Sequence, residues 1–490
     1  MNLAEIRQNL RDYKLQTEKL RLENYFGQNP AKSREEIEEI FSDLFTFSTV
    51  ESLKNAAENA AEHTEIEQHG RKILLQISQL GCLQNQTKEI SREIEKCRKS
   101  VSVKFQDEVL TPANVSEKIK TEENPDVRSE LFTRLIEAEN ICSDLIFERF
   151  SQFHENSKKL GFENLRGIFE EISGVEFQNF AAKAEKFLES TEEIYFRLLA
   201  EICAETKNLQ FSDFLFLNEK IERKSIYAGR HLPFFYAQIL ENFGFSTGKI
   251  SQIKLKKVSK YKQTKSFAPN VPDDIFLCFS VKDGAENYLR FLQNFGIAQK
   301  NGWTSKSLLK RFPEFVFAPD DCLGTAYGFL FQSLLGDESF LRKSFSVKEE
   351  KHINKIIKEN NFRLLFETRR EVLRFLAEAE IYSSEKPDFE HIWQKSAENF
   401  TNNLGFNFKK EQIIFEVSSR NAAQKNVRSR LFAYGLREYF REKYDFLWWN
   451  RRAAFEELID FWNTAERHRA EAMADLIGFE TSFDLLAESF

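Results

Sequence analysis

The stretch Tyr288-Leu-Arg-Phe-Leu-Gln-Asn-Phe-Gly-Ile-Ala-Gln-Lys300 decides how the whole chain is interpreted. It follows two short apolar segments, Ile250–Val258, whose apolar residues alternate loosely, and Ile275–Val281, which is β-prone. Polar residues and two prolines separate these segments. We therefore expect a small strand pair or sheet within about 250–281, followed by a helix over about 286–300.

Outside this β insertion, apolar residues recur at helical spacing over most of the chain. Ile194, Leu198 and Ile202 recur at i, i+4 and i+8 among charged residues, and no proline occurs between Pro125 and Pro233. The same pattern covers residues 3–25, 33–45, 50–100, 126–153, 347–376, the segment around Trp393, and 427–476. The sequence therefore predicts an all-α, mainly helical fold with a small β insertion.

Composition and charge exclude several classes of protein. The chain has 490 residues, 30% charged and 41% hydrophobic, which are ordinary globular values rather than those of a disordered chain. The net charge of −7 gives no pull toward nucleic acid, so we expect no nucleic-acid partner. No apolar run approaches the ~18 residues of a membrane span, and the N-terminal segment lacks the apolar core of a signal peptide. We expect no membrane association and a cytoplasmic location.

Cysteine usage is consistent with that location. The six cysteines are scattered and include no C-x-x-C pair, so we expect reduced thiols that pack in the interior rather than a disulfide framework. They are Cys82, Cys97, Cys142, Cys203, Cys278 and Cys322.

Three stretches resemble the oligoendopeptidase and thimet-oligopeptidase family of zinc metallopeptidases, in the gluzincin clan. Lys265–Leu277 resembles the segment that precedes the zinc helix of that family. Tyr288–Lys300 resembles the zinc helix itself, which reads F-L-H-E-x-G-H-A-x-H in relatives, and Asp321–Leu335 resembles the helix that carries the third ligand. The resemblance implies two mostly helical lobes that flank a deep channel in which peptides would lie.

Each functional position of the family's motif holds a different residue here. Gln293 stands at the first histidine, Asn294 at the general base, Ile297 at the second histidine and Thr325 at the ligating glutamate. The framework residues that keep the motif recognisable are Phe291, Leu292, Gly296 and Ala298.

The zinc chemistry depends on those side chains. Two histidines at i and i+4 share one helix face and bind one Zn²⁺, and the adjacent glutamate takes a proton from the bound water. Ile297 offers no lone pair, the Asn294 amide cannot accept a proton near neutral pH, and neutral oxygens are poor zinc ligands. None of the seven histidines lies three or four residues from another. We expect no metal, no other cofactor and no catalysis, and therefore a pseudo-peptidase that binds a peptide or protein.

The resemblance also suggests a division of the chain and a set of channel residues. Residues 106–127 are polar with two prolines, so we expect an N-terminal helical lobe over 1–105 and a connector over 106–127. The resemblance implies a peptidase-like helical domain over 128–490. Candidate residues lining the channel are Phe295, Gly296, Tyr327 and Asn426. The C-terminal Leu431–Lys443 resembles the closing helices of the family, whose upstream tyrosines help hold the oxyanion; Asn421–Val427 contains no tyrosine.

Two other functions remain open on the sequence. One is a hydrolase with a relocated site around Cys322 or His231, which would need an activated nucleophile beside a base. The other is a helical scaffold whose channel is closed and whose outer surface binds a partner. The sequence leaves the oligomeric state open.

Two further features have a structural interpretation that we favour. The basic run could hold a phosphate or nucleic-acid backbone, but a solvated strand edge protected by lysines is more common. This run comprises Lys249, Lys254, Lys256, Lys257, Lys260, Lys262 and Lys265. Trp448 and Trp449, beside Arg451 and Arg452, are interpreted as core anchors rather than a binding platform.

Overall fold

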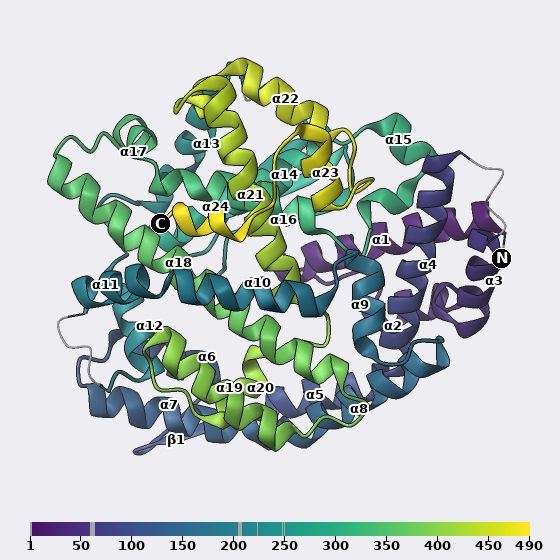
Figure 1. The fold of residues 1–490 in the computed structure, drawn as a ribbon, viewed down its shortest axis with the longest axis horizontal. Coiled ribbons are helices and arrows are strands. Elements are labelled where there is room, and N and C mark those ends of the chain that lie inside the picture. The colour runs from purple at the N-terminus through teal and green to yellow at the C-terminus, as the bar shows by residue number, and fades with distance from the viewer. Residues whose placement is uncertain (1, 59–63, 204–207, 223, 247, 249) are drawn as a thin grey trace. The chain divides into compact units, whose positions relative to one another are not determined.

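The computed structural model describes residues 2–58, 64–203, 208–222, 224–246, 248 and 250–490. Over these residues the chain is mainly helical with two small sheets (Figure 1). This confirms the predicted all-α class with a small β insertion. Within the same ranges, no helix is both long enough and apolar enough to span a bilayer.

The chain divides differently from the division expected over 1–105, 106–127 and 128–490. It forms two compact units, each built from separate stretches of sequence. The first unit contains residues 1–82, 223–354 and 428–486, and the second contains residues 83–222, 355–427 and 487–490. The expected connector holds strand β2 (Glu108–Leu110) and helix α6 (Pro112–Thr121). Val115 and Ile119 of α6 are fully buried in a core cluster with Leu131, so this segment is an integral part of the second unit.

The first unit contains the β insertion and the two helices whose sequences resemble those of a zinc site. Its elements are α1 (Leu3–Phe26), α2 (Arg34–Ile40), η1 (Ser42–Phe45), α3 (Phe47–Glu58), most of α4 (Glu65–Gln86), η3 (Gly229–His231), α13 (Leu232–Asn242), β3 (Ile253–Val258), β4 (Lys265–Asn270), β5 (Asp274–Ser280), α14 (Ala285–Trp303), α15 (Lys306–Arg311), η5 (Pro313–Val316), α16 (Cys322–Gln332), η6 (Ser333–Gly336), α17 (Glu338–Phe345), most of α21 (Ala422–Tyr444), η7 (Trp448–Asn450), α22 (Arg452–Trp462), α23 (Ala470–Ile477) and most of α24 (Phe483–Glu488). The predicted helix over 286–300 is confirmed as α14.

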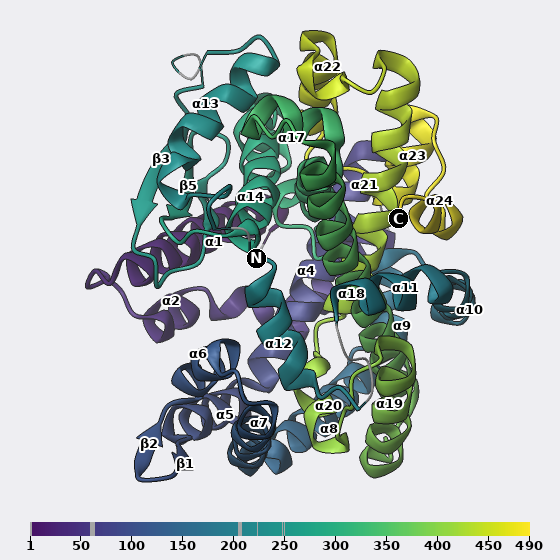
Figure 2. The same ribbon diagram turned by 90° about the vertical axis from the view of Figure 1, so that its left-hand side faces the viewer.

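The β insertion is a three-stranded sheet, the larger of the two expected forms. Their order is β3-β5-β4, with β3 parallel and β4 antiparallel to the central strand. Neighbouring residues of the central strand, such as Leu277 and Cys278, are both fully buried, so β5 is covered on both faces. On one face, Phe267 and Cys278 form a cluster with Tyr25 of α1, and α14 packs on β4 and β5. Figure 2 shows α1 running beside the sheet.

Helix α1 has clear signals at both ends. The Asn2 side chain accepts the Glu5 amide proton while the Glu5 carboxylate accepts that of Asn2, which is a complete capping box. The helix stops at Gly27, whose φ of 69° is left-handed and is easily adopted only without a Cβ. The sequence prediction of a helix over 3–25 is therefore confirmed.

The second unit is a set of helices with one hairpin. Its elements are α5 (Lys88–Ser100), β1 (Val103–Phe105), β2, α6, α7 (Pro125–Glu139), η2 (Asn140–Cys142), α8 (Ser143–Lys159), α9 (Leu165–Ser173), α10 (Phe177–Ser190), α11 (Glu192–Ile202), α12 (Phe211–Lys220), most of α18 (Glu350–Ser383), α19 (Phe389–Leu404) and α20 (Lys410–Glu416). Strands β1 and β2 pair antiparallel, and the sequence analysis missed this hairpin because each strand has only three residues.

The expectation of six reduced cysteines is wrong for two of them. Cys97 of α5 and Cys142 of η2 form a disulfide with Cα atoms 6.0 Å apart, a normal separation for such a bond. Helix α5 packs against η2, and this tertiary contact brings together thiols that are 45 residues apart in sequence. The other four cysteines are free and buried, as expected.

Candidate functional site at the crossing of α14 and α16

Helices α14 and α16 cross with their backbones in contact. A Cβ on Gly296 would lie 2.3 Å from the carbonyl oxygen of Tyr327, and a Cβ on Gly328 would lie 2.8 Å from that of Gln293. Both separations are too short for any side chain, so glycine at each position permits the crossing. The crossing lies within the first unit (Figure 1).

Three of the four motif positions lie at or beside this crossing. Gln293 touches Gly328 directly, and Ile297 lies one turn further along the same face of α14. Thr325 lies three residues before Gly328, and therefore on the same side of α16. All three side chains are half-buried. The Thr325 hydroxyl donates only a long bond, 3.4 Å, to the Asp321 carbonyl.

Asn294 uses both ends of its amide to connect α14 to strand β4. Its Oδ1 accepts the Ser266 amide proton at 2.7 Å, while its Nδ2 donates to the Arg290 carbonyl at 2.8 Å and to that of Thr264 at 3.4 Å. Asn287, seven residues earlier on the same face, donates to the carbonyls of Ser280 and Lys282. The residue at the general-base position is thus one of two amides that fix the helix to the sheet.

A buried ion pair links α14 to the segment between α22 and α23. Lys300 of α14 lies 2.8 Å from Glu466, with both side chains at most 5% exposed. The same Glu466 oxygen accepts the Gly324 amide proton at 3.1 Å, in the first turn of α16. Burial raises the pKa of Glu466, and Lys300 opposes that shift. The carboxylate therefore holds the N-terminus of α16 against α14 and satisfies a buried lysine.

A second buried charge cluster holds the segment before α16. Arg428 makes two hydrogen bonds to Asp320, at 2.9 and 3.0 Å, and two to Glu471, at 2.8 and 2.7 Å. Arg428 is 1% exposed, so this paired arrangement is what makes a buried guanidinium tolerable. The sequence analysis missed Lys300, Glu466 and Arg428. Residue type and spacing gave no signal for them, because Arg428 lies in a helix with several other arginines and Glu466 lies between α22 and α23.

Neither residue suggested for a relocated hydrolase site has an activated nucleophile. Cys322 is buried, its Sγ lies 3.2 Å from the Ser429 hydroxyl, and burial raises the pKa of its thiol well above the usual range. A thiol in this environment is a packing residue rather than a nucleophile. His231 is exposed in η3, and the bond recorded for its side chain comes from its neighbour Arg230.

Three of the four residues expected to line a channel are core residues. Phe295 and Gly296 are buried, and Tyr327 is 1% exposed. Phe295 packs edge-to-face on Phe331, with ring centres 4.9 Å apart. These three residues face inward at the crossing and are part of the aromatic core of the first unit. The fourth, Asn426, is half-exposed and belongs to the second unit, so its role stays a prediction.

The residues at the crossing do not fit a zinc ion. Ile297 presents only hydrocarbon, and the Asn294 amide oxygen already accepts the Ser266 proton. Gln293 and Thr325 supply at most two neutral oxygens, too few and too weak for a zinc site. Elsewhere in the described ranges, no group of three or more histidine, cysteine or acidic side chains is arranged to hold a metal. His63 lies outside the described residues.

The lysine-rich run and the tryptophan pair match their structural interpretations. Strand β3 lies at an edge of the sheet, with Lys254, Lys256 and Lys257 exposed, as expected for a strand edge protected by lysines; Lys249 lies outside the described residues. Trp448 and Trp449 are each 1% exposed, so they are core anchors.

The fold is shared with solved structures of peptidases. BsuCP matches with a TM-score of 0.64 at 11% identity over 99% of this chain and 97% of that one. An M32 carboxypeptidase from Deinococcus radiodurans R1 matches with a TM-score of 0.61 at 9% identity, over 99% and 97%. A protein designated oligoendopeptidase F from Bacillus anthracis str. Ames matches at 0.61 and 11% identity, over 93% and 84%. The sequence matches no family model and no curated protein. The chain therefore has the mainly helical fold of M32 carboxypeptidases and oligoendopeptidase F.

Proposed function

We propose that this protein is a non-catalytic relative of those metallopeptidases, which uses the shared fold to bind a peptide or protein. The observation that carries the proposal is Asn294, at the position of the general base. Its amide is committed to Ser266, Arg290 and Thr264, so this side chain stabilises the helix–sheet packing and has no free basic atom. The cytoplasmic location remains an expectation.

A crossing that holds no metal needs no charged ligands, and the side chains there support this proposal. Ile297 replaces an imidazole with a hydrocarbon, and Gln293 packs its Cγ close to Gly328. Half-buried, neutral side chains of this kind suit contact with a peptide backbone or an apolar side chain better than activation of water.

The proposal is tested with metal loading and peptide assays on the full chain. The purified protein is incubated with Zn²⁺, dialysed and measured for bound metal and for cleavage of a mixed peptide library. We expect substoichiometric zinc, no cleavage and saturable retention of a subset of the library. Stoichiometric zinc with turnover would reject the non-catalytic assignment, and an absence of any retained peptide would reject the binding function.

A matched variant tests whether the motif positions are aligned correctly. In Gln293→His/Ile297→His/Thr325→Glu, three strong zinc ligands return at the crossing while Asn294 keeps its bonds to strand β4. We expect this variant to bind about one zinc per chain, because i and i+4 histidines and a carboxylate one turn from the crossing complete a zinc set. A folded triple variant that binds no zinc would contradict the assigned positions.

A further inference from the structure

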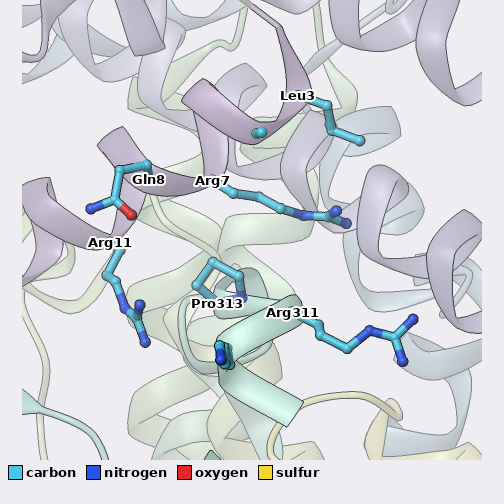
Figure 3. A pocket seen from close by; sticks show the side chains of 8 residues that line it. Leu3, Arg7, Gln8, Arg11, Arg311 and Pro313 are labelled. Atoms are coloured by element: carbon cyan, nitrogen blue, oxygen red, sulfur yellow. The ribbon is translucent and has the colours of Figure 1, made fainter. Parts of the chain in front are cut away.

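A basic cavity lies beside the first turn of α1, on the first unit and apart from the α14–α16 crossing. Its volume is about 390 Å³. Four of its eight lining residues are cationic and none is acidic. The lining residues are Leu3, Ala4, Arg7, Gln8, Arg11, Lys310, Arg311 and Pro313. Figure 3 shows Arg11 extending from α1 on one side of Pro313 and Arg311 extending on the other.

Three of the four cations have no carboxylate partner in the described part of the chain. Arg11 and Lys310 form no recorded ion pair or hydrogen bond, and the Arg311 guanidinium is placed only over the Phe312 ring, 5.2 Å from its centre. The net charge of the chain is −7, and three basic residues of α1 (Arg7, Lys19 and Arg21) do have acidic partners. An uncompensated charge of three around one cavity favours an anion there.

Arg7 lines the cavity and is held in place by two carboxylates. Its Nη2 and Nε bond to the fully buried carboxylate of Glu314 at 2.7 and 3.0 Å, and its Nη1 bonds to Glu67 at 3.1 Å. Gly70 allows this arrangement, because a Cβ there would lie 2.5 Å from Glu314 Oε1. Arg7 is therefore held in one orientation with guanidinium N–H groups to spare, which lowers the entropy lost on binding.

Stabilisation of a helix C-terminus explains only two of the three unpaired cations. Lys310 and Arg311 lie in the last turn of α15, where cations interact favourably with the helix C-terminus. That explanation does not apply to Arg11, which lies on α1 and lines the same cavity from the opposite side of Pro313. It also does not explain why the cavity is open rather than filled.

We propose that this cavity binds a compact, multiply phosphorylated small molecule. The cations approach from two elements, α1 and α15, so the ligand needs acceptor oxygens on at least two sides. A carboxylate is planar and is satisfied by one guanidinium fork, whereas linked phosphates present oxygens in several directions and carry enough charge for three cations. The volume admits two or three linked phosphates beside the apolar Leu3, Ala4 and Pro313.

The test uses inorganic tripolyphosphate as the probe, with the full-length protein and calorimetry at low and moderate salt. We expect one saturable site whose affinity falls as salt rises. Arg11→Gln and Lys310→Gln should each weaken binding about tenfold, as expected for one charge-assisted contact, and Lys310→Arg should restore it. Lys306→Gln is the matched control, because Lys306 lies on the same helix, is exposed outside the cavity and pairs with Asp273; it should leave the affinity unchanged.

Three outcomes would overturn the proposal. They are no saturable binding of tripolyphosphate, equal weakening by Lys306→Gln, and tetraglutamate binding as tightly as tripolyphosphate at equal ionic strength. The substituted side chains are exposed, so melting curves should show that the variants stay folded. None of these results depends on metal loading or peptide retention, and the peptide-binding function is thus tested separately.

Discussion

The side-chain oxygen of Asn294 accepts the backbone amide proton of Ser266 across 2.7 Å. This bond joins helix α14 to the edge strand β4, at the position that the sequence resemblance assigns to the general base. Strand β4 and helix α14 are both in the first unit, and the amide, rather than a carboxylate, can also donate to Arg290 and Thr264. The side chain has a structural role that an ionised acid could fill only in part.

Replacing Asn294 should therefore lower stability. In Asn294→Leu the half-buried Ser266 N–H loses its acceptor, and we expect the free energy of unfolding to fall by about 1–3 kcal/mol. Urea unfolding measures the change. Gln293→Leu is the control, since Gln293 makes no recorded side-chain hydrogen bond in the described ranges; it should shift the value by less than about 1 kcal/mol. Equal effects would show that the Asn294 bonds add no stability.

Because α14 and α16 cross so closely, we expect alanine at position 296 to lower the stability of the protein strongly. Gly296→Ala places a Cβ 2.3 Å from the Tyr327 carbonyl oxygen, and the helices must separate to make room. We expect a loss of about 1–3 kcal/mol or more, measured by thermal unfolding. Gly248→Ala serves as the comparison because nothing lies within 4 Å of its Cβ. A Gly296→Ala protein as stable as the wild type would refute the crossing geometry.

The Lys300–Glu466 pair should show strong coupling. Lys300→Met leaves the Glu466 carboxylate buried without its cation, and we expect a loss of about 3–5 kcal/mol. Adding Glu466→Gln removes the uncompensated charge while keeping an acceptor for the Gly324 amide, so it should recover part of the loss. A double-mutant cycle from urea unfolding gives the coupling, and simple additivity would argue against a direct pair.

Glu378 should make the second unit lose stability as pH rises. It is fully buried in α18, accepts the Ser418 amide proton at 2.8 Å, and burial raises its pKa to about 8 from the usual 4.5. The folded protein keeps this proton while the unfolded chain releases it. The stability that this group contributes is therefore complete below about pH 4.5 and is lost as pH rises through 8.

Glu378→Gln is expected to remove this pH dependence. Urea unfolding at pH 5, 6.5 and 8 should show a smaller decline for the variant than for the wild type. Glu398→Gln, at an exposed position of α19, should follow the wild type. Parallel curves for wild type and Glu378→Gln would mean that the carboxyl is already ionised in the folded state.

The Cys97–Cys142 disulfide predicts a thiol count. In denaturant without reductant, four thiols should react with an alkylating reagent, and six should react after reduction. Cys97→Ser opens a crosslink between residues 45 positions apart and should lower the free energy of unfolding by about 2–4 kcal/mol. Six reactive thiols before reduction would show that the bond is absent. Such bonds persist mainly in oxidising compartments, so the count also tests the expected cytoplasmic location.

The sequence by itself determined the class of the fold, and its resemblance to a zinc helix supplied the hypothesis of an altered motif. Helical periodicity over most of the chain and the framework glycine Gly296 are local patterns, and local patterns can be recognised along the sequence. That hypothesis rests on residue type alone, because Gln293, Asn294, Ile297 and Thr325 stand where the resemblance places the ligands and the general base.

Only the tertiary structure decided which distant residues meet. The pairing of Lys300 with Glu466 and of Cys97 with Cys142, the division into two units built from separate stretches, and the basic cavity between α1 and α15 all join positions far apart in sequence. Such contacts depend on how the elements pack, and the spacing of residues along one chain carries no information about that packing. The role of Asn294 became visible for the same reason, because its partner Ser266 lies on a strand 28 positions earlier.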